Sequence, residues 1–229
     1  MSDASLPSIV ETAKRVITDP AGFYRSMPQS GGFAAPMIFV LVMAVVSGLI
    51  VALLAMVGVD MAAGAAIGFA AVVMLPVMAI IGSFIGAGIL FVIWKLMGSD
   101  RDFETAYRCV AYAAAIMPVT TLLAFVPYLG SAVKVLWSFY LMYLASIEVH
   151  GIPARTAMIV FAVLGGLLLL LNLSAERAAH RMAVQMEQMG GQLEGLGGSL
   201  EGIDRMSPEE AGKAVGEFMK GFENAVGGQ

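Results

Sequence analysis

Residues 34–57 read AAPMIFVLVMAVVSGLIVALLAMV, a stretch without a single charged side chain. A helix needs about 20 apolar residues to cross about 30 Å of hydrocarbon, so this stretch is long enough to span a membrane. The apolar composition continues to Leu173, and the 140 residues from Ala34 onward carry only ten Asp, Glu, Lys or Arg side chains. A water-soluble domain could not cover so much apolar surface. We therefore expect a multi-span membrane domain.

The overall composition agrees with this expectation. Of the 229 residues 59% are apolar and 13% are charged, whereas ordinary globular chains have about 45–50% and about 25%. The net charge of −4 and the lack of a basic stripe argue against a nucleic-acid partner. The single cysteine, Cys109, excludes an intrachain disulfide and a multi-cysteine metal site. No nucleophile–base set or metal-binding motif occurs, so we expect no enzyme activity, cofactor or metal.

We predict five membrane spans, with four or six as alternatives. Their approximate ranges are 34–57, 72–94, 106–125, 132–149 and 154–173. The apolar run 61–97 is too long for one span, because a straight helix of that length measures roughly 55 Å. It either breaks near Pro76 into a hairpin or begins outside the hydrocarbon. We favour the second alternative, because no Asn, Asp or Ser marks a turn near Pro76.

Details within the spans carry further expectations. Pro76 and Pro118 predict kinks. Trp94 and Lys95 are expected to anchor the second span at the membrane interface. Gly82 and Gly86 have the GxxxG spacing that lets helices approach closely, either within one chain or between copies, so they are candidate oligomerisation residues.

The resulting fold class is all-α: a polytopic membrane helix bundle of about five spans with a helical C-terminal tail. Residues 1–33 form a cytoplasmic amphipathic segment, 34–173 the membrane domain, and 174–229 an extramembrane tail. With five spans, most Lys and Arg residues of the loops and the N-terminal segment fall on one side, and the positive-inside rule places that side and the N terminus in the cytoplasm. The C terminus then lies on the far side.

The N-terminal segment repeats apolar residues at helical spacing from Leu6 to Ile17, with Lys14 and Arg15 beside them. This pattern predicts an amphipathic helix. Its apolar face lies either on the membrane surface or against the protein's own loops.

The tail carries a heptad pattern over residues 182–203, which makes its apolar residues candidates for self-association. These residues are Met182, Met186, Met189, Leu193, Leu196, Leu200 and Ile203. Six glycines between Gly190 and Gly202 oppose an isolated helix, each by about 1 kcal/mol. We favour a coiled-coil seam between copies over a disordered tail or a membrane-lying helix. A second helix is predicted from Ser207 to about Ala225.

Charged residues between the spans provide two further candidate sites. The first is a candidate cytoplasmic docking loop, which comprises Asp100, Arg101, Asp102, Glu104 and Arg108. The alternative is that this loop is simply solvated. The second is a set of pathway charges, Lys134, Glu148 and His150. Their alternatives are an interfacial Lys134 and an ion pair between Glu148 and Arg155.

Several segments together resemble the Yip family (Ypt-interacting protein domain), in its bacterial branch. They are DPAGFYRSMPQSGG at residues 19–32, AYRCVAYAAAIMP at residues 106–118 and PYLGSAVKVLWSFYLMYLASIEVHGIPARTA at residues 127–157. The resemblance covers about residues 19–173. It implies five spans with a cytosolic N terminus. The acidic-aromatic DLYGP signature of eukaryotic members is absent, and the heptad tail lies outside the resemblance.

The sequence therefore predicts a non-enzymatic integral membrane scaffold, adaptor or membrane-shaping protein of the Yip type. We expect it in the bacterial cytoplasmic (inner) membrane, in contact with the lipid bilayer, self-assembled into a homo-oligomer, and with a protein partner at its cytoplasmic face. The alternative is an oligomeric channel or transporter. That alternative needs polar side chains deep in the membrane, and the spans offer few.

Overall fold

The computed structural model describes residues 6–56, 64–123, 126, 128–201, 209, 212–213, 216 and 219–220, and these are mostly helical with no strand among them. The helices are α1 (Leu6–Thr18), α2 (Pro20–Ser26), α3 (Ala34–Met56), α4 (Gly64–Leu96), α5 (Phe103–Tyr112), the 3₁₀ helix η1 (Ala113–Ile116), α6 (Met117–Leu123), α7 (Leu129–Glu148) and α8 (Ala154–Glu201). The predicted all-α class is confirmed. The chain divides into two compact units, Met1–Ala175 and Glu176–Gln229.

Five stretches of the described helices are long and apolar enough to cross a membrane. They are Ala34–Met56, Val72–Leu96, Phe103–Leu123, Leu129–Glu148 and Ala154–Gly191. The expected five-span membrane protein is therefore confirmed. Helix α4 continues through Pro76, so the hairpin alternative for residues 61–97 was wrong. A proline is tolerated within such a helix. That the first part of the run lies outside the hydrocarbon stays a prediction.

The third span is interrupted near Pro118. The backbone changes from α-helix to 3₁₀-helix over Ala113–Ile116 and returns to α-helix at Met117. The N–H of Met117 donates to the carbonyl of Ala114, three residues earlier. Proline has no N–H, and its ring crowds the carbonyl four residues before it, so an α-helical bond to Ala114 from Pro118 is impossible. The tighter turn satisfies that carbonyl instead.

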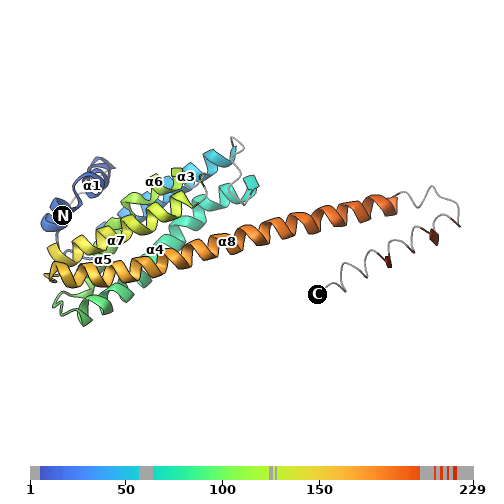
Figure 1. The fold of residues 1–229 in the computed structure, drawn as a ribbon. Helices are drawn as coiled ribbons and strands as arrows, with labels where there is room; N and C mark the ends of the chain where they lie inside the picture. Colours follow the sequence, from blue (N-terminus) through green and yellow to red (C-terminus); the bar gives the residue numbers. More distant parts are fainter. Residues whose placement is uncertain are drawn as a thin grey trace. The chain divides into compact units, whose positions relative to one another are not determined.

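Unit 1 is a helix bundle in which α3 packs along α4 and also contacts α5 and α6 (Figure 1). Helices α5 and η1 lie inside the bundle, and the largest fully buried side chains come from five different segments. Those side chains are Tyr24, Phe39, Trp94, Tyr107 and Leu141. Trp94 is 1% exposed, so the expectation of an interface anchor was wrong: its indole packs inside the protein.

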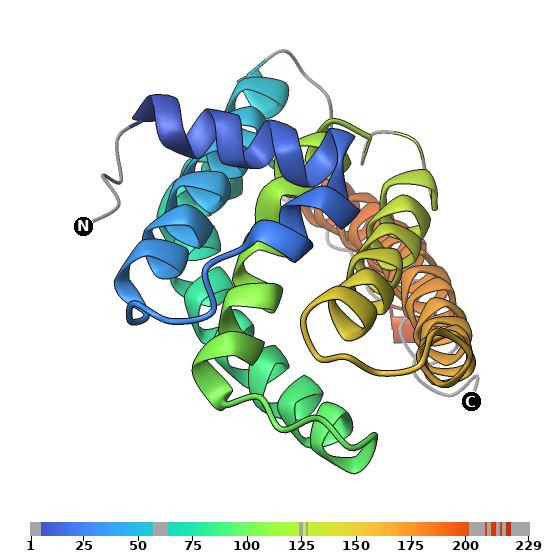
Figure 2. The same cartoon turned by 90° about the vertical axis from the view of Figure 1, so that its left-hand side faces the viewer.

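Helix α1 crosses the bundle over η1, as Figure 2 shows. Its Val16 is fully buried and Ile9 is 6% exposed, so the apolar face packs on the protein itself rather than on the membrane surface. Val10, on another face, is 65% exposed. Asp19 then caps α2 by accepting a hydrogen bond from the N–H of Gly22 (3.0 Å).

In the second unit, α8 is helical up to Glu201, which the heptad interpretation requires. Met182, Met186 and Met189 are 60–72% exposed. The side chains of Leu193, Leu196 and Leu200, and Ile203 as a whole, lie outside the described residues. Self-association through this segment stays a prediction. Most of the helix predicted from Ser207 also lies outside them.

Candidate functional site

The polar contacts of unit 1 gather at one end of the bundle, which we call the polar end. It comprises residues 26–33, 97–102 and 149–153, together with the helix ends that these segments join. Helices α4 and α7 both finish there on a glycine in the left-handed region, with φ +93° at Gly98 and +66° at Gly151. Only glycine adopts this conformation without strain. The two turns bring Ser99 and His150 together.

His150 lies in a buried, fully partnered environment. Its ring stacks on Trp94 with 3.9 Å between ring centroids and 19° between planes. Its Nδ1 lies 2.8 Å from the hydroxyl oxygen of Ser99, and its Nε2 lies 4.0 Å from the sulfur of Cys109. The indole N–H of Trp94 donates to the hydroxyl of Ser146 (2.7 Å). Helix α4, the loop after it and α5 thus meet the end of α7 at this histidine.

The same surroundings keep His150 neutral. The side chain is only 7% exposed, and burial lowers the pKa of His150 from its ordinary 6.5 to about 4. The positive charges of Arg101 and Lys95 lower the pKa further. Arg101 also ties the turn to α7, because its Nε donates to the carbonyl of Val149 (3.0 Å). The imidazole is therefore stacked on Trp94 and enclosed by the protein.

Arg108 forms a second buried network, which holds the segment before α3. Its side chain is 4% exposed, and its Nε donates to Glu104 (3.1 Å). Its Nη2 donates to the carbonyl of Gly32 (2.7 Å) and its Nη1 to that of Pro28 (3.4 Å). Glu104 also accepts the N–H of Gly32 (2.7 Å). The ion pair therefore fixes residues 28–32 against α5.

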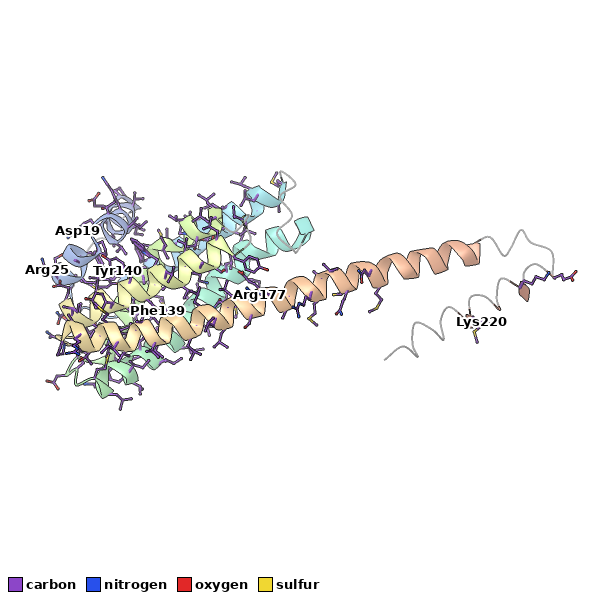
Figure 3. All side chains as sticks on the ribbon, viewed as in Figure 1. Asp19, Arg25, Phe139, Tyr140, Arg177 and Lys220 are labelled. Atoms are coloured by element: carbon purple, nitrogen blue, oxygen red, sulfur yellow. The ribbon has the colours of Figure 1, made fainter. Side chains whose placement is uncertain are left out.

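Helix α2 is held by two contacts of different kinds. Arg25 binds the two carboxylate oxygens of Glu148 at the end of α7, at 2.8 and 3.0 Å. Figure 3 shows Arg25 at this end of the bundle. The buried hydroxyl of Tyr24 donates to the carbonyl of Cys109 (3.1 Å), and burial raises the pKa of Tyr24 well above its ordinary value. The expected pair between Glu148 and Arg155 is replaced by the pair with Arg25.

Asp102 begins α5 as its N-cap. Its carboxylate accepts the backbone N–H of Thr105 (2.8 Å) and lies 2.7 Å from the Thr105 hydroxyl. These hydrogen bonds hold the pKa of Asp102 below its usual range. The Thr105 hydroxyl is also 3.0 Å from the carbonyl oxygen of Gln29. The cap therefore links the loop after α4 to the segment before α3.

The Yip1 domain family matches residues 14–175 of this chain. The chain belongs to the Yip1 domain family. No curated protein and no solved structure matches it. The family match ends at Ala175, where the first compact unit also ends, so the Yip1 domain is the five-span unit and its preceding helices. The resemblance drawn from the sequence motifs is confirmed, and the protein is a membrane protein of the Yip family.

Within the Yip1 domain, the residues of the candidate docking loop divide into two groups. Asp100, Arg101 and Asp102 are exposed, although Arg101 also binds Val149 and Asp102 caps α5, whereas Arg108 is buried and Glu104 is occupied by Arg108 and Gly32. A partner at this end would meet the first group. Docking itself stays a prediction.

The structure does not bring the three candidate pathway charges together. Lys134 is exposed in the first turns of α7, at the opposite end of that helix from Glu148 and His150. Glu148 pairs with Arg25, and His150 is enclosed. Within the described part of the chain, no group of three or more His, Cys, Asp or Glu side chains could hold a metal ion.

The two candidate oligomerisation glycines on α4, Gly82 and Gly86, have different surroundings. A Cβ on Gly86 would lie 3.8 Å from a methyl group of Val110, which is ordinary contact with α5. A Cβ on Gly82 would meet no atom within 4 Å, and Gly82 is exposed. Gly86 therefore packs within the chain, and Gly82 lies on a free face.

Sequence reasoning missed Arg25, Trp94, Ser99 and Cys109 as members of the polar end. The sequence did contain a signal for Trp94 and Ser99, because they flank the turn at Gly98. Their partners Ser146 and His150 flank the end of α7 in the same way. The resemblance had also included the segment that contains Tyr24 and Arg25. Which of these groups meet depends on how the spans pack.

Proposed function

We propose that this Yip1 domain protein is a non-enzymatic membrane scaffold or adaptor, which shapes or organises the membrane through self-assembly. The observation that carries the proposal is the interlocked polar end. Three loops and α2 are fixed there by Arg108 with Glu104, by Arg25 with Glu148, and by the ring of His150. A rigid surface of this kind suits a docking platform better than a catalytic centre, which needs accessible reactive groups.

The platform would present its exposed charges to a protein partner. Asp100, Arg101 and Asp102 lie next to one another on the loop between α4 and α5. Replacing all three by Ser should abolish partner capture, and an unchanged thermal midpoint must show that the contacts of Arg101 with Val149 and of Asp102 with Thr105 are not what is lost. The triple change Lys134→Ser, Arg177→Ser and Arg181→Ser, at exposed residues outside the polar end, is the control.

An apolar face on α4 supports self-assembly. Ile81, Ile85 and Ile89 are 49–60% exposed and recur every four residues, so they share one face of the helix. Gly82 adjoins this face and has open space above its Cα. A second copy could approach closely there. The exposed methionines of α8 supply a further surface at heptad spacing.

The mass of the protein in detergent tests self-assembly. We expect an oligomer of the full chain and a smaller species when residues 182–203 are deleted. Gly82→Leu should also reduce the mass, whereas Gly166→Leu, at an exposed glycine of α8 with equally open surroundings, should not. A monomeric full chain, or unchanged masses in both variants, would remove self-assembly from the proposal.

A channel or transporter remains the second candidate. The buried hydroxyls of the spans argue against it, because Ser47, Thr120 and Ser146 each lie within hydrogen-bond distance of carbonyls in their own helix. They are therefore occupied rather than directed toward a path. Ion or small-solute flux through liposomes that contain the purified protein would reverse this ranking.

We further propose the bacterial cytoplasmic membrane as the location, with the polar end and the N terminus in the cytoplasm and the C terminus outside. The native Cys109 is fully buried, so an introduced cysteine can be labelled selectively. Asp100→Cys should resist a membrane-impermeant maleimide in intact cells and react after lysis. Labelling in intact cells would reverse the orientation.

A further inference from the structure

A cavity of about 270 Å³ lies between α1, the segment 26–31 and the start of α3. Arg15 of α1 and Arg108 of α5 line it. The cavity also borders Ala35 and Phe39, in the first two turns of the first membrane span. It therefore lies at the level where the polar end passes into the apolar bundle.

Both arginines retain capacity for an anion. Arg15 is exposed, and its Nη2 donates to the hydroxyl of Ser26 (3.0 Å), which is a neutral partner. Arg108 is 3% exposed, pairs with Glu104 through its Nε and donates to two carbonyls through its terminal nitrogens, so it uses three N–H groups, one from each nitrogen. A guanidinium has five, so one N–H remains on each terminal nitrogen. Buried donors of this kind favour a charged acceptor.

The rest of the lining is amphipathic and carries no carboxylate. The hydroxyls of Thr12, Ser26 and Ser30 supply polar groups, whereas Phe23, Met27 and Phe39 supply an apolar wall. A free phosphate would contact only the hydroxyl groups and not the apolar wall. A phospholipid would place its phosphate against the arginines and its glycerol and first methylene groups along the apolar wall.

We propose that this cavity binds the headgroup of an anionic phospholipid, with Arg15 and Arg108 as phosphate ligands. Bound lipid would fix α1 to the bundle at the membrane boundary, where basic side chains meet anionic headgroups. The proposal stands apart from self-assembly, because every residue that carries it comes from one chain. It goes beyond the scaffold role by assigning a ligand to the Yip1 domain.

Native mass spectrometry of the full chain, released from nonionic detergent, tests the proposal. Dioleoyl phosphatidylglycerol is titrated, and the dissociation constant of the first bound lipid is compared among Arg15→Gln, Arg15→Lys and Lys14→Gln. Arg15 is exposed, so these variants should fold, and an unchanged thermal midpoint without lipid checks this. Lys14→Gln removes the same charge from the adjacent residue, which does not line the cavity.

We expect Arg15→Gln to weaken lipid binding at least fivefold, Arg15→Lys to weaken it less, and Lys14→Gln to stay within twofold of the parent. Phosphatidylcholine and inorganic phosphate should each bind at least fivefold more weakly than phosphatidylglycerol. Equal losses in the two glutamine variants would overturn the site, because only diffuse surface charge would then be involved. Equal binding of inorganic phosphate would overturn the lipid assignment.

Discussion

The second and third spans are both apolar, yet they have different surroundings. In the apolar 18-residue stretch of the third span, Phe103–Leu123, 44% of the residues are buried inside the protein, and in that of the second span, Val72–Leu96, only 11% are. The third span contributes Tyr107, Arg108 and Cys109 to the packed interior. The second span presents isoleucines on its outer face. Hydrophobicity alone therefore brings a helix into the membrane, and specific polar contacts decide which helix becomes the centre of the bundle.

Removing Arg108 from the buried third span should have the largest effect on the stability of the protein. Arg108→Met removes the cation that pairs with the partly buried Glu104 and leaves the carbonyl of Gly32 without its donor, which should destabilise the protein by about 3 kcal/mol. Thermal unfolding in detergent measures the change. Arg155→Met, at an exposed residue, should stay within about 0.5 kcal/mol. Similar midpoints for the two variants would mean that the network does not hold the bundle.

Acid should weaken the same end through His150. The unfolded chain takes up the proton at the ordinary pKa of 6.5, and the folded chain only at about 4. Protonation of His150 therefore does not affect the free energy of unfolding above pH 6.5. As the pH is lowered from 6.5 to 4, it reduces that free energy by at most about 3 kcal/mol. Unfolding midpoints across this range measure the slope.

His150→Phe keeps a ring against Trp94 and removes the proton, so its midpoint should vary less between pH 6.5 and 4. Asp102, whose pKa is lowered, loses its contribution only below its ordinary 3.8, so the two effects separate by pH. An unchanged slope in His150→Phe would assign the acid effect elsewhere.

A smaller effect should follow from Trp94→Phe. The change keeps an aromatic ring on His150 but removes the hydrogen bond from the indole N–H to Ser146. We expect a loss of about 1 kcal/mol in the free energy of unfolding. Trp137→Phe is the control for removing an indole N–H that makes no hydrogen bond in the described structure, although the Trp137 side chain is only partly buried. The prediction fails if Trp137→Phe destabilises as much.

The outward face of α4 should respond least. Ile85 is 60% exposed, so Ile85→Ala should change the stability of the single chain by under about 0.5 kcal/mol. Leu141→Ala, at a fully buried residue of α7, should cost about 2–5 kcal/mol. Unfolding under conditions that keep the protein monomeric measures both. A large loss in Ile85→Ala would place this face inside the fold.

The sequence predicted the spans because each depends only on the apolar content of one stretch of chain. The predicted span 34–57 agrees closely with the observed Ala34–Met56, and Gly98 and Gly151 lie where α4 and α7 end. The bend before Pro118 follows equally from one local cause, the missing N–H. Wrong expectations concerned partners: Trp94 turned inward, and Glu148 paired with Arg25 rather than the nearby Arg155.

The candidate site shows the same division. Local chemistry marked Glu148, His150 and the charges from Asp100 to Arg108 as unusual in an apolar chain, and most of them do take part in the polar end. Their roles differ from those expected, because a role depends on which groups lie opposite. Arg108 contacts Gly32 across 76 residues of sequence, and His150 contacts Ser99 across 51.

The sequence by itself determined that this chain is a five-span helical membrane protein of the Yip1 domain family, because apolar length and family motifs are properties of the chain read in order. Only the tertiary structure decided that the charged residues close one end of the bundle on themselves, and that α1 covers a cavity lined by two arginines. These features arise from side chains far apart in sequence, which meet only when the packed helices bury their polar groups together.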